Sequence, residues 1–314
     1  MYTMNPVFFK ILSCVLYSLN NVFLKALPLT PLVIIALQHT VASLFLWRPG
    51  LFVPLSDTRC WISSAFAFLG MIFWIFSLKN LSVFQTVTLG FLSPIFTVVG
   101  ARVFLKESIT LFKCLVILSS IIGGLFISLE SRILTLTFQK NDIHFFLPLA
   151  GSVCFAICQL MNKKTLHKHS YQSVTFFMAI SLSSLAWVTL FLEWLLAHSD
   201  PSLSFPTMPT VWVNAVLLGL STAGAFLFSN KALSVKEITF LLPFGSTRFI
   251  ATALLGCLLF LEKAPSLLFG SFFFLEKTPS LWMWGGSIII IVSLALLTRH
   301  EKKFSTSLNR PEQS

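Results

Sequence analysis

The amino-acid sequence predicts an all-α membrane protein of ten transmembrane helices, arranged as two inverted repeats of five helices. Three observations predict this fold: the composition, the number of apolar stretches, and a similarity between the two halves of the chain. Hydrophobic residues make up 56% of the 314 residues, charged residues only 11%, and the mean hydropathy is +0.86. Because a soluble globular domain carries about 25% charged residues, this composition excludes a water-soluble, fibrous or disordered protein.

Ten apolar stretches are long enough to cross the hydrocarbon core of a bilayer, which takes about 20 residues of helix. Prolines mark several borders between them, among them Pro28, Pro49 and Pro279. The polar stretches between the spans are too short for a folded domain outside the membrane. The expected spans are residues 7–26, 31–48, 60–79, 83–104, 111–129, 145–164, 171–193, 210–230, 236–261 and 281–298.

The two halves of the chain resemble each other in sequence. Residues 77–83 recur as residues 229–235, with serine, lysine, leucine and valine at matching positions. A proline follows each copy, at Pro94 and Pro243, and we expect each to break the helix of its span. Five spans are an odd number, so the second half enters the membrane from the opposite side, as in many secondary transporters. The expected units are a first repeat at residues 5–130, a second at residues 143–300, and a cytoplasmic tail at residues 301–314.

The basic residues indicate the orientation of the chain. The net charge is +11, from 22 Lys and Arg residues against 11 Asp and Glu residues. Most of the basic residues flank the spans on the side that holds both termini, so the positive-inside rule predicts cytoplasmic termini. They form no stripe of basic and aromatic residues of the kind that binds nucleic acid, and we expect no nucleic-acid partner.

A second, local repeat lies near the end of the chain. Residues 259–267 recur fourteen positions later as residues 273–281. The apolar stretch at residues 267–275 is too short to cross a bilayer. We expect either an interfacial or re-entrant hairpin on the outer side, or an insertion without a function.

Polar side chains within the spans are candidates for a binding site, because polar groups are costly in hydrocarbon. Arg248 suits a carboxylate, although an arginine near a helix end can also extend to the interface. His39 could carry a proton or hydrogen-bond a neighbouring helix. Trp74 and Phe244 could stack on a purine or a sulfonium, or pack in the core. The candidate substrate-binding residues are Asn21, Gln38, His39, Trp74, Gln159, Phe244 and Arg248.

Missing motifs narrow the function further. The sequence contains no ATP-binding loop and no hydrolase or metalloprotease motif, so we expect neither an enzyme nor a cofactor. The cysteines lie mostly in apolar runs, where they act as small hydrophobes, and we expect no metal site. All Asp and Glu residues lie at span ends, in loops or in the tail. The absence of a carboxylate within a span argues against proton-driven drug export.

The duplicated layout resembles the drug/metabolite transporter superfamily, of the ten-span EamA type. The resemblance rests on residues 94–107, which end at Glu107, and on Pro243-Phe244 with Arg248 leading to residues 254–256. It covers residues 5–300.

Within the superfamily, the chain is similar to the S-adenosylmethionine carriers of obligate intracellular bacteria. This similarity rests on Asn20-Asn21, Trp74 and residues 162–164. The chain departs from them at His39, where such carriers often have an arginine, and in the extra segment 259–281.

This resemblance implies a secondary transporter of the bacterial inner membrane, working by alternating access on a small-molecule substrate within the lipid bilayer. It implies uptake of S-adenosylmethionine in exchange for S-adenosylhomocysteine. The alternatives are an amino-acid or drug exporter of the same superfamily, a membrane-embedded enzyme that acts on lipid, and a scaffold that moves no solute. A homodimer also stays open.

Overall fold

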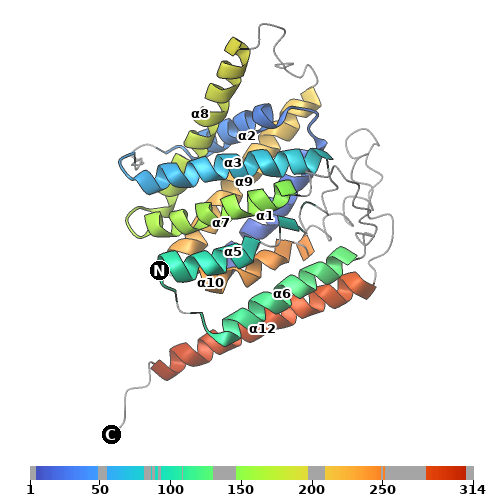
Figure 1. The fold of residues 1–314 in the computed structure, drawn as a ribbon, viewed down its shortest axis with the longest axis vertical. Helices are drawn as coiled ribbons and strands as arrows, with labels where there is room; N and C mark the ends of the chain where they lie inside the picture. Colours follow the sequence, from blue (N-terminus) through green and yellow to red (C-terminus); the bar gives the residue numbers. More distant parts are fainter. Residues whose placement is uncertain are drawn as a thin grey trace.

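The computed structural model is helical throughout the part of the chain that it describes, where no strand occurs (Figure 1). It describes residues 5–48, 55–80, 86, 89–90, 93–107, 109–129, 146–196, 209–248, 250–251 and 281–308. The elements are α1 (Pro6–Ala26), α2 (Pro31–Leu46), α3 (Thr58–Asn80), α5 (Ser93–Gly100), the π-helix η1 (Ala101–Leu105), α6 (Leu111–Leu129), α7 (Phe146–Leu166), α8 (Tyr171–Leu196), α9 (Pro209–Val235), α10 (Ile238–Leu241), the 3-10 helix η3 (Pro243–Ser246) and α12 (Leu281–Leu308).

Every expected span contains helix, but the fourth and the ninth are irregular. The fourth is described as α5 and η1, and the ninth begins with the single turn α10 followed by η3. Pro243 starts η3, so the α-helical pattern stops where a proline removes a backbone donor. Pro94 lies in α5, and whether it breaks the helix of the fourth span stays a prediction, because residues 91–92 lie outside the described residues. The hairpin expected within residues 259–281 lies outside the described residues.

Helix length and surface composition identify an integral membrane protein. Among the described residues, 4 helices are long and apolar enough to cross a bilayer, namely α3, α7, α8 and α9. Large apolar side chains such as Leu44, Leu118 and Phe191 are exposed on the helix surfaces. A water-soluble monomer rarely exposes large contiguous apolar surface, whereas lipid solvates it.

Two antiparallel helix pairs form the centre of the molecule. In the first pair, Ser13 Oγ of α1 donates to the carbonyl of Ala225 in α9 at 2.8 Å. In the second, Ser63 Oγ of α3 donates to Asn162 Oδ1 of α7 at 2.5 Å. Such polar bonds between helices help to hold membrane bundles together, where apolar burial supplies little driving force.

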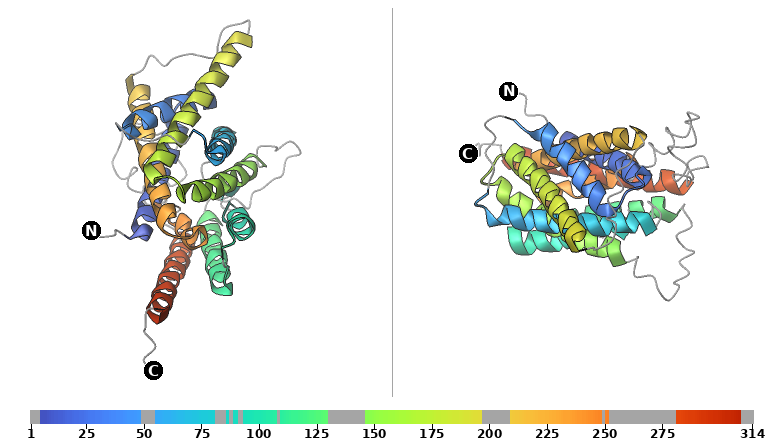
Figure 2. Two further views of the ribbon diagram at one scale, coloured as in Figure 1. Left: turned by 90° about the vertical axis from the view of Figure 1, so that its left-hand side faces the viewer. Right: turned by 90° about the horizontal axis from the view of Figure 1, so that it is seen from above.

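The pair of α6 and α12 lies at one end of the molecule, and α8 extends at the other (Figures 1 and 2). Ser119 of α6 and Ser293 of α12 share a hydrogen bond of 2.8 Å. One turn further along α6, Gly123 lies so close to α12 that an added Cβ would be 2.9 Å from the carbonyl oxygen of Gly286. Small residues therefore set the distance between these two backbones.

The helix contacts occur in corresponding sets when the two halves are matched in chain order. The α1–α9 pair corresponds to the α7–α3 pair, and α2–α9 corresponds to α8–α3. The α2–α8 and α6–α12 contacts each join a helix to its own counterpart. The same helix pairs are thus in contact in both matchings, although the extent of contact differs between them.

The buried carboxylate of Glu107, in the first half of the chain, bonds to the second half at the break between α9 and α10. Glu107 follows η1, which ends at Lys106 in a left-handed conformation with φ of 56°. Glu107 Oε1 accepts from the N–H of Ile238, and Oε2 accepts from the N–H of Thr239, both at 3.0 Å. Thr239 Oγ1 also donates to Oε2 at 2.7 Å. The carboxylate therefore satisfies donors that the start of α10 leaves open.

Lys163 acts on the other side of the same break. Its Nζ donates to the carbonyl oxygens of Leu233 at 2.6 Å and of Lys236 at 2.7 Å, at the end of α9. A cation at a helix C-terminus also interacts favourably with the helix dipole. Lys163 therefore bonds the carbonyl groups at the end of α9, and Glu107 bonds the N–H groups at the start of α10.

We predict that Glu107→Ala lowers the free energy of unfolding by about 2–4 kcal/mol, because two buried N–H groups lose a charged acceptor. Thermal unfolding of the purified protein in detergent measures the loss. Glu193→Ala is the control: this carboxylate is exposed on α8, so its loss should stay below about 1 kcal/mol. Equal losses would contradict the capping role.

We also predict that Gly123→Ala destabilises the α6–α12 pair, because the new methyl group meets the backbone of Gly286. The melting temperature in detergent should fall. Gly285→Ala on α12 serves as the control, since nothing lies within 4 Å of a Cβ at that position. An unchanged melting temperature for Gly123→Ala would show that the two helices separate without cost.

Candidate functional site

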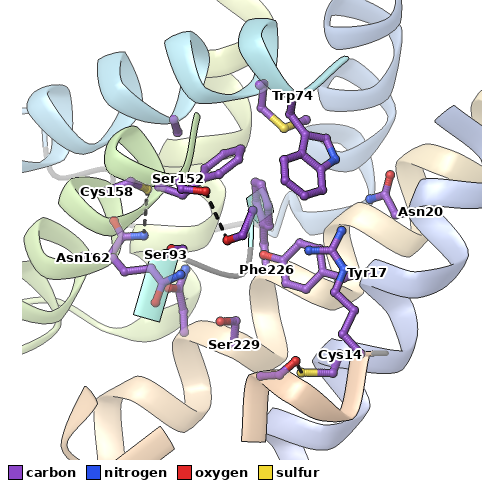
Figure 3. A pocket seen from close by; sticks show the side chains of 18 of the residues that line it. Cys14, Tyr17, Asn20, Trp74, Ser93, Ser152, Cys158, Asn162, Phe226 and Ser229 are labelled. Carbon is purple, nitrogen blue, oxygen red and sulfur yellow. Dashed lines mark hydrogen bonds between the residues drawn. The ribbon is translucent and has the colours of Figure 1, made fainter. Parts of the chain in front are cut away.

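A cavity of about 220 Å³ lies between the two central helix pairs (Figure 3). α1, α3, α7 and α9 supply most of its lining, and the residues from 242 to 248 supply another part. In Figure 3, Tyr17, Trp74, Ser152 and Phe226 point from four helices toward the same space. The amide, hydroxyl and basic side chains that line it are Lys10, Tyr17, Asn20, Asn21, Gln38, Ser93, Ser152, Gln159, Asn162, Ser229, Asn230 and Arg248.

Arg248 joins three elements at one side of the cavity. Its Nη2 donates to Asn21 Oδ1 at 2.7 Å, and Trp74 Nε1 donates to the same oxygen at 3.4 Å. The guanidinium carbon lies 5.3 Å from the centre of the Trp74 ring and 5.4 Å from that of Tyr17. Both distances are within the range of cation–π attraction. The arginine is thus held by an amide and two aromatic faces, in reach of the cavity.

Other amides of the lining connect helices. Asn20 Nδ2 and Gln38 Nε2 both donate to Thr222 Oγ1, at 2.6 Å and 2.8 Å. Within the described residues, Asn20 Oδ1, Gln38 Oε1 and Asn21 Nδ2 are buried and have no hydrogen-bond partner. Such orphaned groups are costly, so this region contains both donors and acceptors that a polar ligand could satisfy.

The wall formed by α7 contacts the fourth span. Ser152 Oγ donates to the carbonyl oxygen of Gly90 at 3.1 Å. At the corresponding place in the other half, Cys14 Sγ of α1 donates to the carbonyl oxygen of Phe244 at 3.4 Å. Both irregular spans therefore present backbone carbonyls to the first helix of the opposite half. Gln159 lines the cavity between these walls, and no hydrogen bond is formed by its amide within the described residues.

Most of the residues expected to bind substrate meet at the cavity. Those in its lining are Asn21, Gln38, Trp74, Gln159 and Arg248, together with Pro94. Phe244 and Pro243 are buried but are not part of the lining. The Phe244 ring packs on Phe240 with centroids 5.6 Å apart, so the core-packing alternative applies to it in this structure.

His39 is also outside the cavity lining. It is fully buried, its Nδ1 lies 2.9 Å from the carbonyl oxygen of Ile35, and its ring is 5.8 Å from that of Phe226. Phe226 lines the cavity, so the histidine lies behind it. The bond to Ile35 lies within α2 and not to a neighbouring helix, and Nε2 is buried without a hydrogen-bond partner among the described residues, so the role of His39 stays a prediction.

The sequence analysis missed Tyr17 and Lys10. On α1 the cavity is lined by residues spaced four, three, four and three apart. This spacing is one face of a helix, so the position of Asn21 as a candidate could have drawn attention to Tyr17, one turn earlier. The residues with this spacing are Lys10, Cys14, Tyr17, Asn21 and Leu24, and Asn20 beside them also lines the cavity.

Comparison with known proteins agrees with this architecture. Residues 4–129 match the EamA-like transporter family. A crystal structure superposes with a TM-score of 0.69 at 16% identity, over 95% of this chain and 97% of that chain, which shows a shared fold.

Curated relatives carry transporter names. A riboflavin transporter of Brucella anthropi is 27% identical over 86% of this chain and 89% of its own length. A riboflavin transporter of Vibrio cholerae is 24% identical over 76% of this chain and 70% of its own length. An S-adenosylmethionine uptake transporter of Rickettsia felis is 26% identical over 62% of this chain and 61% of its own length. Residues 4–129 therefore resemble an EamA-like domain, and the chain is similar over most of its length to curated transporters, which indicates a transporter rather than an enzyme.

Proposed function

We propose that the chain is a secondary transporter that moves a small heteroaromatic metabolite by alternating access of two inverted halves, each with five membrane spans. The observation that carries this proposal is the cavity between α1, α3, α7 and α9, to which both halves contribute. A site between two similar halves can be opened to either side when one half rocks against the other.

The antiparallel packing supports the inverted arrangement. α6 and α12 are counterparts in the two halves, yet Phe112 near the start of α6 stacks on His300 near the end of α12, with centroids 4.4 Å apart. Counterparts that run in opposite directions are what an inverted repeat requires. With the basic residues on the side of both termini, we place the chain in a bacterial inner membrane with cytoplasmic ends, and the repeats at residues 5–130 and 143–300.

The lining indicates the kind of substrate. Tyr17, Trp74, Phe155 and Phe226 provide aromatic surface, and six amide side chains provide donors and acceptors among them. A planar ring with polar edges matches such a cavity, since aromatic faces favour stacking and amides bind the edges. Riboflavin has an uncharged tricyclic ring with an imide edge and fits this description. The two riboflavin relatives align with more of this chain than the Rickettsia felis relative does.

Uptake of S-adenosylmethionine in exchange for S-adenosylhomocysteine is the second candidate. The name of the Rickettsia felis relative supports it. Both molecules contain an adenine, which suits the aromatic lining, and a carboxylate, which suits the guanidinium of Arg248.

Counterflow in proteoliposomes tests the proposal. Vesicles are loaded with unlabelled riboflavin or S-adenosylmethionine, and the same compound is added outside in labelled form. Transient accumulation of label identifies the substrate, and competition by S-adenosylhomocysteine tests exchange. If neither compound accumulates in vesicles that demonstrably contain folded protein, the heteroaromatic proposal is wrong, and labelled amino acids would test the export alternative.

We predict that Asn21→Leu reduces counterflow of the transported compound at least about tenfold, because a charged hydrogen bond of about 1.5–3 kcal/mol no longer positions Arg248 and Trp74. Asn80→Leu is the matched control, because Asn80 is exposed at the end of α3, and among the described residues its amide donates to the carbonyl of Phe76 in its own helix. Its counterflow should equal that of the wild type. Equal activity of Asn21→Leu would exclude this cluster from the site.

A further inference from the structure

The charged side chains in the lining of the cavity are both basic. Two basic side chains, Lys10 and Arg248, are part of its lining. No Asp or Glu occurs in α1, α2, α3, α7 or α9, nor between residues 238 and 251. The helices that enclose the cavity therefore supply positive charge and no carboxylate to balance it.

The aromatic faces beside Arg248 already bind a cation. The guanidinium carbon is 5.3 Å from the centre of the Trp74 ring and 5.4 Å from that of Tyr17. A cationic group of a ligand that approached either ring would compete with the guanidinium for the same π surface and be repelled by it. These two rings therefore favour contact with an uncharged ligand ring over contact with a second cation.

Lys10 adds to this field from the start of α1. It lies on the same helical face as Tyr17 and Asn21, and its side chain is partly buried. Within the described residues, its ammonium group forms no ion pair. Low-dielectric walls strengthen the effect of such charges on a ligand, because little solvent screens them.

We propose that Arg248 and Lys10 make the cavity select by charge: it accepts neutral or anionic heteroaromatic ligands and discriminates against ligands with a net positive charge. Arg248 is the main specificity-determining residue, because it lies between Asn21 and the two aromatic rings. This inference rests on the proposed function and deepens it. It ranks S-adenosylhomocysteine, which has no net charge, above S-adenosylmethionine, which differs by one methyl group and one positive charge.

Two matched ligand pairs test the inference on the purified full-length chain by equilibrium dialysis. The first pair is S-adenosylhomocysteine and S-adenosylmethionine. The second is riboflavin and 5′-amino-5′-deoxyriboflavin, in which an ammonium group replaces one hydroxyl. In each pair that binds, the member without the extra positive charge should bind at least about tenfold tighter.

Variants assign the effect to the two basic residues. Arg248→Gln should bring the ratio of affinities within a pair toward one, whereas Arg248→Lys should keep it. Lys10→Gln provides an independent variant at the other end of the α1 face, and it should lower the ratio as well even if Arg248→Gln fails to fold.

The outcomes separate the two levels of the proposal. Equal or tighter binding of the cationic member of either pair by the wild type would overturn charge selection and leave the transporter proposal intact. An unchanged ratio in both Arg248→Gln and Lys10→Gln would also overturn it. Binding of none of the four compounds by folded protein would overturn both the heteroaromatic proposal and the charge selection that rests on it.

Discussion

The carboxylate of Glu107 on the backbone of α10 is the contact on which the central architecture depends. The start of a helix leaves N–H groups, and its end leaves C=O groups, without partners inside the helix. Here the second half breaks between α9 and α10, and the first half supplies the acceptor for Ile238 and Thr239. Because the break and its cap belong to different halves, the capping bond also fixes how the halves meet.

The cavity follows from the close packing around it. Gly70 of α3 and Gly151 of α7 face each other, and a Cβ on Gly151 would be 3.4 Å from the carbonyl oxygen of Gly70. The α3 and α7 backbones can therefore approach closely along one line. The large side chains of Tyr17, Trp74 and Phe226 project into the space that remains between this pair and the α1–α9 pair.

Hydropathy predicted the helical ranges well, because the thickness of a bilayer prescribes the length of each apolar stretch. Local chemistry also predicted the helix break at Pro243. Hydropathy does not predict how each helix is rotated about its axis, and this rotation decides which side chains line the cavity. Asn21, Trp74 and Arg248 were found because polar or amphipathic groups within a span require a partner. His39 and Phe244 were placed outside the cavity by packing between helices, which no single stretch of sequence encodes.

The hydrogen bond between Arg248 and Asn21 connects ligand binding with the relative position of the two halves. Arg248 comes from the segment after η3, and Asn21 comes from α1, so their 2.7 Å hydrogen bond crosses the two halves. A ligand that bonds to the Arg248 guanidinium or the Asn21 amide replaces a contact between halves with a contact to itself. In a low-dielectric interior this exchange changes the stability of one arrangement of the halves relative to another. The residues proposed to recognise the ligand are therefore also residues that hold the halves together.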